Sequence, residues 1–219
     1  NYIFMMNNQK IVVCLPAYNA AKTLTRTFRE IPRPLVDEVI LVDDASDDET
    51  VAVANELGIH HIIRHSVNRG YGANQKTCYK KALELDADII IMLHPDYQYN
   101  PALIPSFCYL ISERIYPVVL GSRILGGSAL KQGMPLYKYI SNRALTFLQN
   151  ILLARKLSEY HTGYRAYCRE VFSLVRTDLL SDDYLFDNQF LSVVLYAGYE
   201  VGEISCPAHY FPEASSINF

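Results

Sequence analysis

The chain has 219 residues, of which half are hydrophobic and a fifth are charged, and its formal net charge is -3. This composition is typical of a globular protein with one sizeable core and excludes a disordered or fibrous chain. The acidic balance argues against a broad basic surface, so we expect no nucleic-acid partner. The five cysteines form no C-x-x-C pair, which predicts reduced thiols.

Targeting and domain organisation are also constrained by the sequence. No apolar run reaches the ~18 residues that span a bilayer, and no signal-peptide pattern is visible. We therefore expect a cytoplasmic protein, either free or held peripherally at the inner membrane face. The length predicts one domain. We expect an N-terminal extension over residues 1–9, a nucleotide-sugar-binding half over 10–125 and an acceptor-side half over 126–219 of the same domain; whether the native protein continues beyond these residues stays open.

The first half of the chain alternates between apolar, β-branched runs and stretches with helical apolar spacing. The expected strands are Lys10–Leu15, Val36–Ser46, His60–Ser66, Ala87–Asp96 and Tyr116–Ile124. The expected helices are Ala20–Glu30, Asp47–Leu57, Asn74–Glu84 and Pro101–Glu113. This alternation predicts an α/β fold with parallel strands and crossover helices, and the continuously apolar strands predict a sheet that is covered on both faces.

The second half is less regular. After a Gly/Ser/Lys-rich loop at 126–135 we expect a long helix at Leu136–Leu153, helices at Cys168–Val175 and Phe186–Ala197, and a final extended segment at Tyr199–Phe211. The apolar spacing of the long helix, with lysines nearby, fits a helix that lies on a membrane surface. It fits a core helix equally, and we favour the core.

Polar motifs stand where three of the expected strands end. They are "PAYN" at Pro16–Asn19, "DDAS" at Asp43–Ser46 and "HPDYQ" at His94–Gln98. Because ligands bind beyond the carboxyl ends of the strands in such sheets, we expect these motifs at one edge. Two carboxylates that end a buried strand are costly unless they bind something. The alternatives are a simple turn for "PAYN" and helix capping for "DDAS".

Taken in order, these motifs resemble one enzyme family. The motifs "VVCLPAYNA", "EVILVDDASDDET", "NRGYGANQK", "HPDYQ", "GSR" and "TGYRAY" are similar to those of the family-two glycosyltransferases, and most of all to the dolichyl- or polyprenyl-phosphate sugar transferases. The resemblance covers residues 10–210. It implies a GT-A, Rossmann-like fold and an inverting transfer from a nucleotide-sugar to an acceptor. The implied acceptor is a polyprenyl phosphate at the inner membrane face.

The resemblance also implies a nucleotide-sugar-binding set, which comprises Pro16, Tyr18, Asn19, Asp44, Gly70, Gly72 and Lys76. Tyr18 would pack near the base, and Asp44 would accept a hydrogen bond from it. The two glycines lie in a loop that opens a helix, so its backbone N–H groups are expected to face the donor; the alternative is an ordinary Gly-rich loop. The family often has Glu at the place of Ala20, so one donor contact is missing.

The third strand-end motif is related to a metal site. The family's Asp-x-Asp-x-Gln form holds Mg²⁺ or Mn²⁺ against the donor diphosphate, and here the corresponding residues are His94, Asp96 and Gln98. Oxygen-only sites suit Mg²⁺, whereas an imidazole shifts the preference toward Mn²⁺. Asp96 would act in catalysis through the cation, which neutralises the leaving diphosphate. Alternatively, His94 only ends the strand and Asp96 begins a turn.

The acceptor side is predicted from single residues. Arg123, Arg143 and Arg165 lie in segments where the family grips a phosphate, and the guanidinium fork suits this task, although helical arginines are usually solvated. Asp187, in "LFDNQF", resembles the acid of the family's F-D-x-E segment, with Gln189 in place of the Glu. It would be a general base for a hydroxyl acceptor, or a helix cap. The remaining histidines are expected to be structural or exposed: His60, His61, His65, His161 and His209.

Three other functions remain to be weighed. Transfer to a sugar hydroxyl in polysaccharide or cell-envelope synthesis is the main enzymatic alternative. A non-catalytic nucleotide-sugar-binding module is the second, because His94, Ala20 and Gln189 depart from the family pattern. A Rossmann oxidoreductase is disfavoured, because no G-x-G-x-x-G follows the first expected strand.

Overall fold

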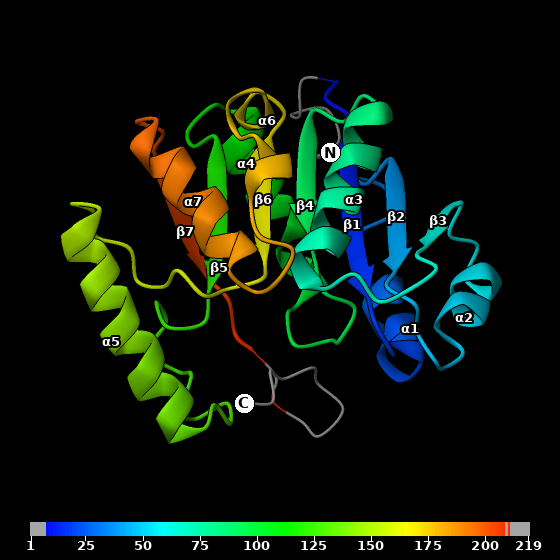
Figure 1. The fold of residues 1–219 in the computed structure, drawn as a ribbon, viewed down its shortest axis with the longest axis horizontal. Coiled ribbons are helices and arrows are strands. Elements are labelled where there is room, and N and C mark those ends of the chain that lie inside the picture. The colour runs from blue at the N-terminus through cyan, green and yellow to red at the C-terminus, as the bar shows by residue number, and fades with distance from the viewer. Residues whose placement is uncertain (1–7, 209, 211–219) are drawn as a thin grey trace.

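The computed structural model describes residues 8–208 and residue 210, so His209 lies outside the described residues. One seven-stranded sheet, in the order β3-β2-β1-β4-β6-β5-β7, runs through the centre (Figure 1). Its strands are β1 (Ile11–Ala17), β2 (Glu38–Asp43), β3 (His61–Arg64), β4 (Ile89–Met92), β5 (Val118–Ser122), β6 (Arg165–Cys168) and β7 (Val201–Ser205). The α-helices are α1 (Ala21–Glu30), α2 (Thr50–Glu56), α3 (Tyr71–Glu84), α4 (Ile104–Ser112), α5 (Leu136–Leu152), α6 (Val171–Leu174) and α7 (Phe186–Tyr196). Short 3-10 turns lie at η2 (Pro101–Leu103) and η3 (Thr177–Leu179).

The sheet is mostly parallel, as the strand–helix alternation predicts. Among the strands of the described chain, β6 alone runs antiparallel to its neighbours, β4 and β5. The sequence does not predict this strand: it assigns no element between Leu153 and Cys168 and predicts a helix from Cys168 onward. Four residues are too few to show a period, and β6 is stabilised by strands that come from distant parts of the chain.

Two apolar layers confirm that both faces of the sheet are covered. Successive residues of β1 point to opposite faces, so Val13 belongs to one buried cluster and Val12 to the other. Helices α1, α2 and α4 supply the first cluster, and α3, α6 and α7 supply the second. The carboxyl ends of the strands are thereby fixed between two packed layers.

Helix α5 stands apart at one side of the molecule (Figure 1). Its buried residues, Asn142 and Thr146, are polar. Its large apolar side chains are exposed, by 49% to 72%: Leu136, Tyr137, Ile140, Leu145, Phe147, Leu148, Ile151 and Leu152. The favoured core placement is therefore wrong, because apolar spacing identifies an amphipathic helix but not the side that contacts the protein.

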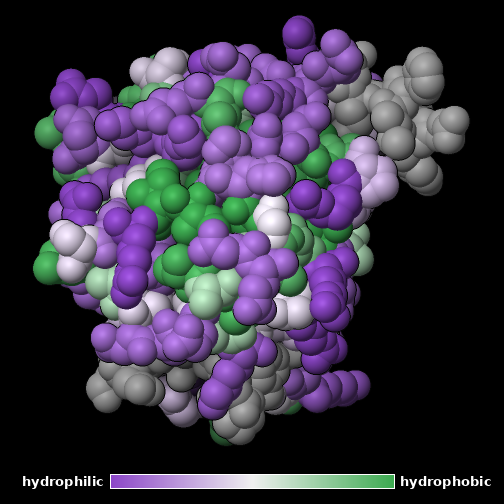
Figure 2. All heavy atoms as spheres, turned by 90° about the vertical axis from the view of Figure 1, so that its right-hand side faces the viewer, coloured by the Kyte–Doolittle hydropathy of each residue, from purple (hydrophilic) through white to green (hydrophobic). Residues whose placement is uncertain are grey.

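The opposite end of the sheet, at β3 and α2, presents mainly hydrophilic residues with a smaller apolar area in the middle (Figure 2). This face therefore differs from α5, where exposed apolar side chains lie close together along one helix. In the described part of the chain, no helix is both long enough and apolar enough to cross a bilayer.

Candidate active site

The segments after β1 and β2 form one polar edge through bonds between backbone and side chain. The N–H of Asn19 donates to Ser46 Oγ at 2.8 Å, and the N–H of Asp47 donates to Asn19 Oδ1 at 2.9 Å. The N–H of Asp44 donates to the carbonyl oxygen of Ala17 at 2.9 Å. The "PAYN" and "DDAS" motifs therefore meet at the carboxyl edge of the sheet.

The turn after β4 continues this edge. The N–H of Leu93 donates to the Cys14 carbonyl oxygen at 3.0 Å, so the pairing of β1 with β4 extends one residue beyond β4. Of the expected nucleotide contacts, Pro16 is buried within β1, Tyr18 is 51% exposed, and Asn19 has a left-handed φ of 51°. An exposed ring at this edge is free to pack on a base, and the contact of Tyr18 with the nucleotide stays a prediction.

Asp44 is buried and already holds the Gly-rich loop. Its Oδ1 accepts from His65 Nδ1 at 2.7 Å and from the Arg69 N–H at 2.9 Å, and its Oδ2 accepts from the Gly70 N–H at 2.9 Å. His65 also contacts Thr77 Oγ1 at 3.0 Å. A carboxylate has about four acceptor positions, so one is left. Recognition of the base by Asp44 stays a prediction. In addition, Asp44 holds the Gly-rich loop in place.

The start of α3 does not face the donor edge as expected. The N–H groups of Gly72 and Ala73 both donate to the carbonyl oxygen of Asp182, at 2.7 Å and 3.1 Å. A Cβ on Gly72 would lie 2.5 Å from the Ser181 carbonyl oxygen, so this glycine is needed for close approach of the chain itself. Lys76 Nζ bonds the same segment, 2.8 Å from Asp182 Oδ1. Gly72 and Lys76 thus contact the loop before α7, and their donor contacts stay predictions.

His94 is held by a chain of side chains that leads to α7. The Tyr71 hydroxyl lies 3.1 Å from His94 Nε2 and donates to Asp187 Oδ2 at 2.7 Å. The Tyr71 and His94 rings stack, with centroids 5.2 Å apart. Burial lowers the pKa of His94 to about 4, so its imidazole is neutral near pH 7. Tyr71 lies within the "NRGYGANQK" motif, but sequence reasoning gave it no role.

Asp96 and Gln98 form the tip of the turn after β4. Asp96 Oδ1 accepts from the Gln98 N–H at 3.0 Å, and the Tyr97 hydroxyl is bonded away from the edge, to Glu30 at 2.6 Å. Burial raises the pKa of Asp96 to about 6, which means that its negative charge lacks full compensation. A divalent cation would supply that compensation.

The residues of this turn fit a cation site that is complete only when a bound diphosphate supplies further oxygen ligands. Within residues 8–208, no three His, Cys, Asp or Glu side chains gather to hold a metal ion by themselves. His94, Asp96 and Gln98 offer one nitrogen donor and two kinds of oxygen donor. Mg²⁺-type sites commonly combine one or two carboxylates with substrate phosphates, so a diphosphate would supply the missing ligands.

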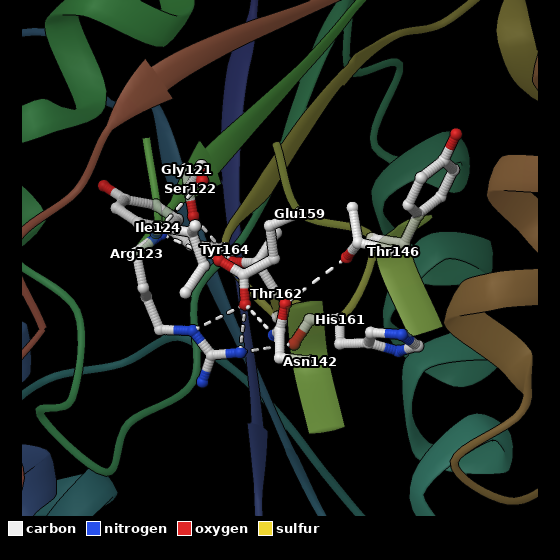
Figure 3. A network of polar contacts seen from close by, with 12 residues as sticks. Gly121, Ser122, Arg123, Ile124, Asn142, Thr146, Glu159, His161, Thr162 and Tyr164 are labelled. Carbon is white, nitrogen blue, oxygen red and sulfur yellow. Dashed lines mark hydrogen bonds and ion pairs between the residues drawn. The ribbon is translucent and has the colours of Figure 1, made fainter. Parts of the chain in front are cut away.

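Arg123 is the centre of a buried ionic network (Figure 3). Its N–H and Nε donate to Glu159 at 2.8 Å and 2.9 Å, and its Nη2 bonds both Glu159 and the His161 carbonyl oxygen. Its Nη1 lies 3.5 Å from Gln98 Oε1 and so faces the turn after β4. Burial opposes ionisation of Glu159, but the Arg123 charge outweighs it and lowers the pKa of Glu159.

The same network attaches α5. Glu159, which is fully buried, also accepts from Asn142 Nδ2 of α5 at 2.8 Å (Figure 3). Thr146 donates to Asn142 Oδ1 at 3.3 Å. Sequence reasoning missed Glu159, because a single acid in a loop gives no sign of burial.

The other two predicted arginines differ from each other. Arg143, on α5, is exposed and donates to the Ser158 carbonyl oxygen at 3.0 Å, so it stays a predicted phosphate contact. Arg165 is fully buried and donates to the carbonyl oxygens of Thr162, Tyr160 and Asp187. A guanidinium with no exposed surface cannot reach an acceptor, so that prediction is wrong and Arg165 supports the start of α7.

Asp187 is buried, with 8% of its surface exposed. Its Oδ2 accepts from Tyr71, and its Oδ1 is enclosed with no hydrogen-bond partner among the described residues. His161 Nε2 is similarly unpaired within that part of the chain. Gln189, at the place of the family's Glu, accepts from the Ser181 N–H at 2.7 Å and so holds the loop before α7. The role of Asp187 as a general base stays a prediction.

This edge combines a carboxylate under the Gly-rich loop with a His/Asp/Gln turn beside an arginine, at the strand ends of a mostly parallel sheet. The family model "Glycosyl transferase family 2" matches residues 12–175, and the chain belongs to this family. The resemblance inferred from the motifs is thereby confirmed.

Several curated proteins are similar over most of the chain. An uncharacterized protein, MJ1222, of Methanocaldococcus jannaschii is 29% identical over 91% of this chain and 81% of its own length. The UDP-N-acetylglucosamine–dolichyl-phosphate N-acetylglucosaminyltransferase of Methanococcus voltae is 27% identical over 91% of this chain and 85% of its own length. The glycosyltransferase AglD of Haloferax volcanii is 26% identical over 89% of this chain, which corresponds to 32% of AglD.

Solved structures confirm the fold. Glucosyl-3-phosphoglycerate synthase of Mycobacterium tuberculosis superposes with a TM-score of 0.73 at 17% identity, over 93% of this chain and 74% of that one. The same enzyme in complex with Mn²⁺, UDP and phosphoglyceric acid gives a TM-score of 0.69 over 96% of this chain and 74% of that one.

Proposed function

We propose that this family 2 member transfers a sugar, with inversion, from a nucleotide-sugar to a polyprenyl phosphate, and that it uses a divalent cation. One observation carries the proposal. The turn with Asp96 and Gln98 lies at the same carboxyl edge as the interlocked "PAYN" and "DDAS" segments, beside Arg123 Nη1. A carboxylate and a buried guanidinium side by side at the strand ends support the proposal that a donor diphosphate and its cation bind there.

The chain's residues divide the work. Tyr18 and Asp44 would position the base, and Asp96 and Gln98, with His94, would hold the cation. When bound, the cation neutralises the diphosphate that leaves from the anomeric carbon. Arg123 is buried, is ionised and is held rigid by Glu159, so it would stabilise the same charge without having to reorganise.

Helix α5 supports a lipid acceptor. Between Leu125 and Leu157 the sequence contains five basic residues and no acidic one: Lys131, Lys138, Arg143, Arg155 and Lys156. The helix also exposes its apolar face. An apolar face flanked by positive charge fits the surface of an anionic bilayer, where each basic residue contributes about 1 kcal/mol. We propose that α5 lies on the inner membrane face and brings Arg143 to the acceptor phosphate.

The relatives are consistent with this acceptor. The name of the Methanococcus voltae protein describes transfer to dolichyl phosphate, and that protein aligns with this chain over most of both lengths. A phosphate acceptor is already ionised, so it needs no strong base. This agrees with an Asp187 carboxylate that is occupied by Tyr71.

A direct assay tests the proposal. The chain is incubated with UDP-, GDP- and dTDP-sugars, Mn²⁺ and either a polyprenyl phosphate or a soluble oligosaccharide, and glycolipid is separated by extraction into organic solvent. We expect metal-dependent product with the lipid phosphate and its loss with EDTA. Turnover with the oligosaccharide alone would contradict the lipid acceptor, and no turnover with any donor would favour a binding module.

One observation favours a second acceptor class. Asp187 keeps 8% of its surface exposed and its Oδ1 has no hydrogen-bond partner within the described chain, so a substrate hydroxyl would complete its hydrogen bonding. The variant Asp187→Asn separates the two classes in the same assay. With Mn²⁺ kept saturating, a sugar-hydroxyl acceptor predicts a fall in kcat of about a hundredfold or more, whereas a phosphate acceptor predicts a small change in kcat.

A further inference from the structure

One hydroxyl group connects the turn after β4 with α7. The Tyr71 oxygen lies 3.1 Å from His94 Nε2 and 2.7 Å from Asp187 Oδ2. Asp187 is buried, and its carbonyl oxygen is fixed by the buried Arg165 at 2.9 Å. Asp187 and Arg165, which are both buried, therefore fix the position of the Tyr71 hydroxyl.

The direction of these hydrogen bonds fixes the tautomer of His94. A phenol has one proton, and Tyr71 donates it to Asp187 Oδ2. The Tyr71 oxygen can then only accept from His94, so His94 Nε2 carries the ring proton. A neutral imidazole has one N–H, and Nδ1 therefore presents a bare lone pair.

The ring orientation points that lone pair away from the packed side. A Cβ built on Gly163 would lie 2.7 Å from His94 Cδ2 and 2.8 Å from Nε2, so this edge of the ring lies against the Gly163 backbone. The Tyr71 ring stacks on one face of the imidazole, tilted by only 6°. Nδ1 lies on the opposite edge of the ring, and no described residue donates a hydrogen bond to it.

We infer that Tyr71 and Asp187 are positioning residues that hold His94 as an Nδ1 metal ligand, and that the site consequently prefers Mn²⁺ to Mg²⁺. The inference rests on the proposed function. Metal-binding histidines usually donate their second ring N–H to a group that fixes the tautomer, and loss of that group costs about 10- to 100-fold in metal affinity. An imidazole ligand suits transition metals better than it suits Mg²⁺. The chain thus compensates for the missing first Asp of the motif with an oriented nitrogen donor.

Electron paramagnetic resonance of bound Mn²⁺ tests this inference without any turnover. Mn²⁺ is titrated into the protein with and without UDP, and electron spin echo modulation is recorded for the bound ion. We expect ¹⁴N modulation from a directly bound imidazole in the unaltered protein and its loss in His94→Asp. That variant should also bind Mg²⁺ relatively better, because it restores an oxygen-only set.

Tyr71→Phe removes the positioning hydroxyl and keeps the stacked ring. We expect Mn²⁺ affinity to fall by about 10- to 100-fold, with weaker ¹⁴N modulation and a smaller change in Mg²⁺ affinity. Tyr184→Phe is the matched control, since the Tyr184 ring also packs on Tyr71, 4.9 Å away, but is half exposed. Thermal melting shows that each variant is folded.

The outcomes separate this inference from the proposed function. Mn²⁺ that is not bound, or that is bound without ¹⁴N modulation, would overturn the inference even if sugar transfer is observed with Mg²⁺. Unchanged Mn²⁺ affinity in folded Tyr71→Phe would overturn the positioning role. Conversely, ¹⁴N modulation with no transfer to any acceptor would support the inference and contradict the proposed function.

Discussion

The carboxyl edge of the sheet and helix α5 distribute their polar and apolar side chains in opposite ways. We call this edge, where the "PAYN", "DDAS" and "HPDYQ" segments lie, the donor edge. At the donor edge apolar strands are buried and polar side chains emerge only where the strands end, each bonded to a neighbouring loop. In α5 the polar residues Asn142 and Thr146 face the protein, and the apolar side chains face outward. The polar groups of the donor edge are thus held in place by bonds within the chain, whereas covering the apolar face of α5 would lower the free energy by burying apolar surface.

Glu159 connects the donor edge with helix α5. It bonds Arg123, which faces the turn after β4, and Asn142, which anchors α5 (Figure 3). The buried residues of α5 are polar, and Asn142 bonds Glu159. The apolar outer face of α5 can therefore pass from water to a membrane while Glu159 holds the inner face in place. The network therefore physically connects α5 with the turn after β4, at which we propose the cation binds.

The largest expected effect breaks this connection. Glu159→Ala leaves Arg123 buried without its carboxylate, and loss of one partner of a buried ion pair costs about 3–5 kcal/mol. We expect a fall of this size in the free energy of unfolding, measured by urea denaturation. Asp178→Ala is the control, because it breaks the exposed pair with Arg176 and should cost little. Equal effects of the two variants would contradict the central place of Glu159.

The next effect concerns the donor edge alone. Asp96→Asn keeps the shape of the turn but removes its negative charge, so the proposed cation site loses its one carboxylate. We expect the rate of transfer at saturating Mn²⁺ to fall by about a hundredfold, which corresponds to about 2.7 kcal/mol of leaving-group stabilisation. The exposed Glu113→Gln serves as the control. A rate near that of the unaltered protein would remove Asp96 from the mechanism.

A smaller effect addresses the α5 side. Phe147 is 68% exposed, and its full burial in a bilayer is worth about 1.5–3 kcal/mol. We expect Phe147→Ala to weaken binding to vesicles that contain anionic lipid by about tenfold, as measured by flotation. Tyr196→Ala is the matched control, because Tyr196 is 93% exposed but lies on α7. Binding that is equally strong to neutral vesicles would contradict the part assigned to the basic residues.

The sequence predicts those regions that depend on contacts between residues close together in the chain. It does not predict those that depend on contacts between distant residues. Continuous apolar runs and turn residues predicted the sheet, and the rule that ligands bind at strand ends predicted the "PAYN" and "DDAS" edge. The contacts of Gly72 and Lys76 with Asp182 were not predicted, because Asp182 lies more than a hundred residues away. The buried side of α5 depends on Glu159, and the orientation of His94 depends on Tyr71 and Asp187. None of these pairings leaves a periodic or local signal.

The smallest expected effect is the pH dependence of metal binding at the donor edge. Burial raises the pKa of Asp96 to about 6, so protons compete with the cation at a higher pH than they would for an exposed Asp. The sign follows because only the ionised carboxylate binds metal: between pH 7 and pH 5.5 the ionised fraction, and with it Mn²⁺ affinity, should fall about fourfold. Burial lowers the pKa of His94 to about 4, so its imidazole stays neutral over this range and adds no second step. The measurement is a Mn²⁺ titration followed by the signal of the free ion. A flat profile over this range would mean that Asp96 does not bind the cation, and a second, steeper loss above pH 5.5 would mean that His94 is protonated there.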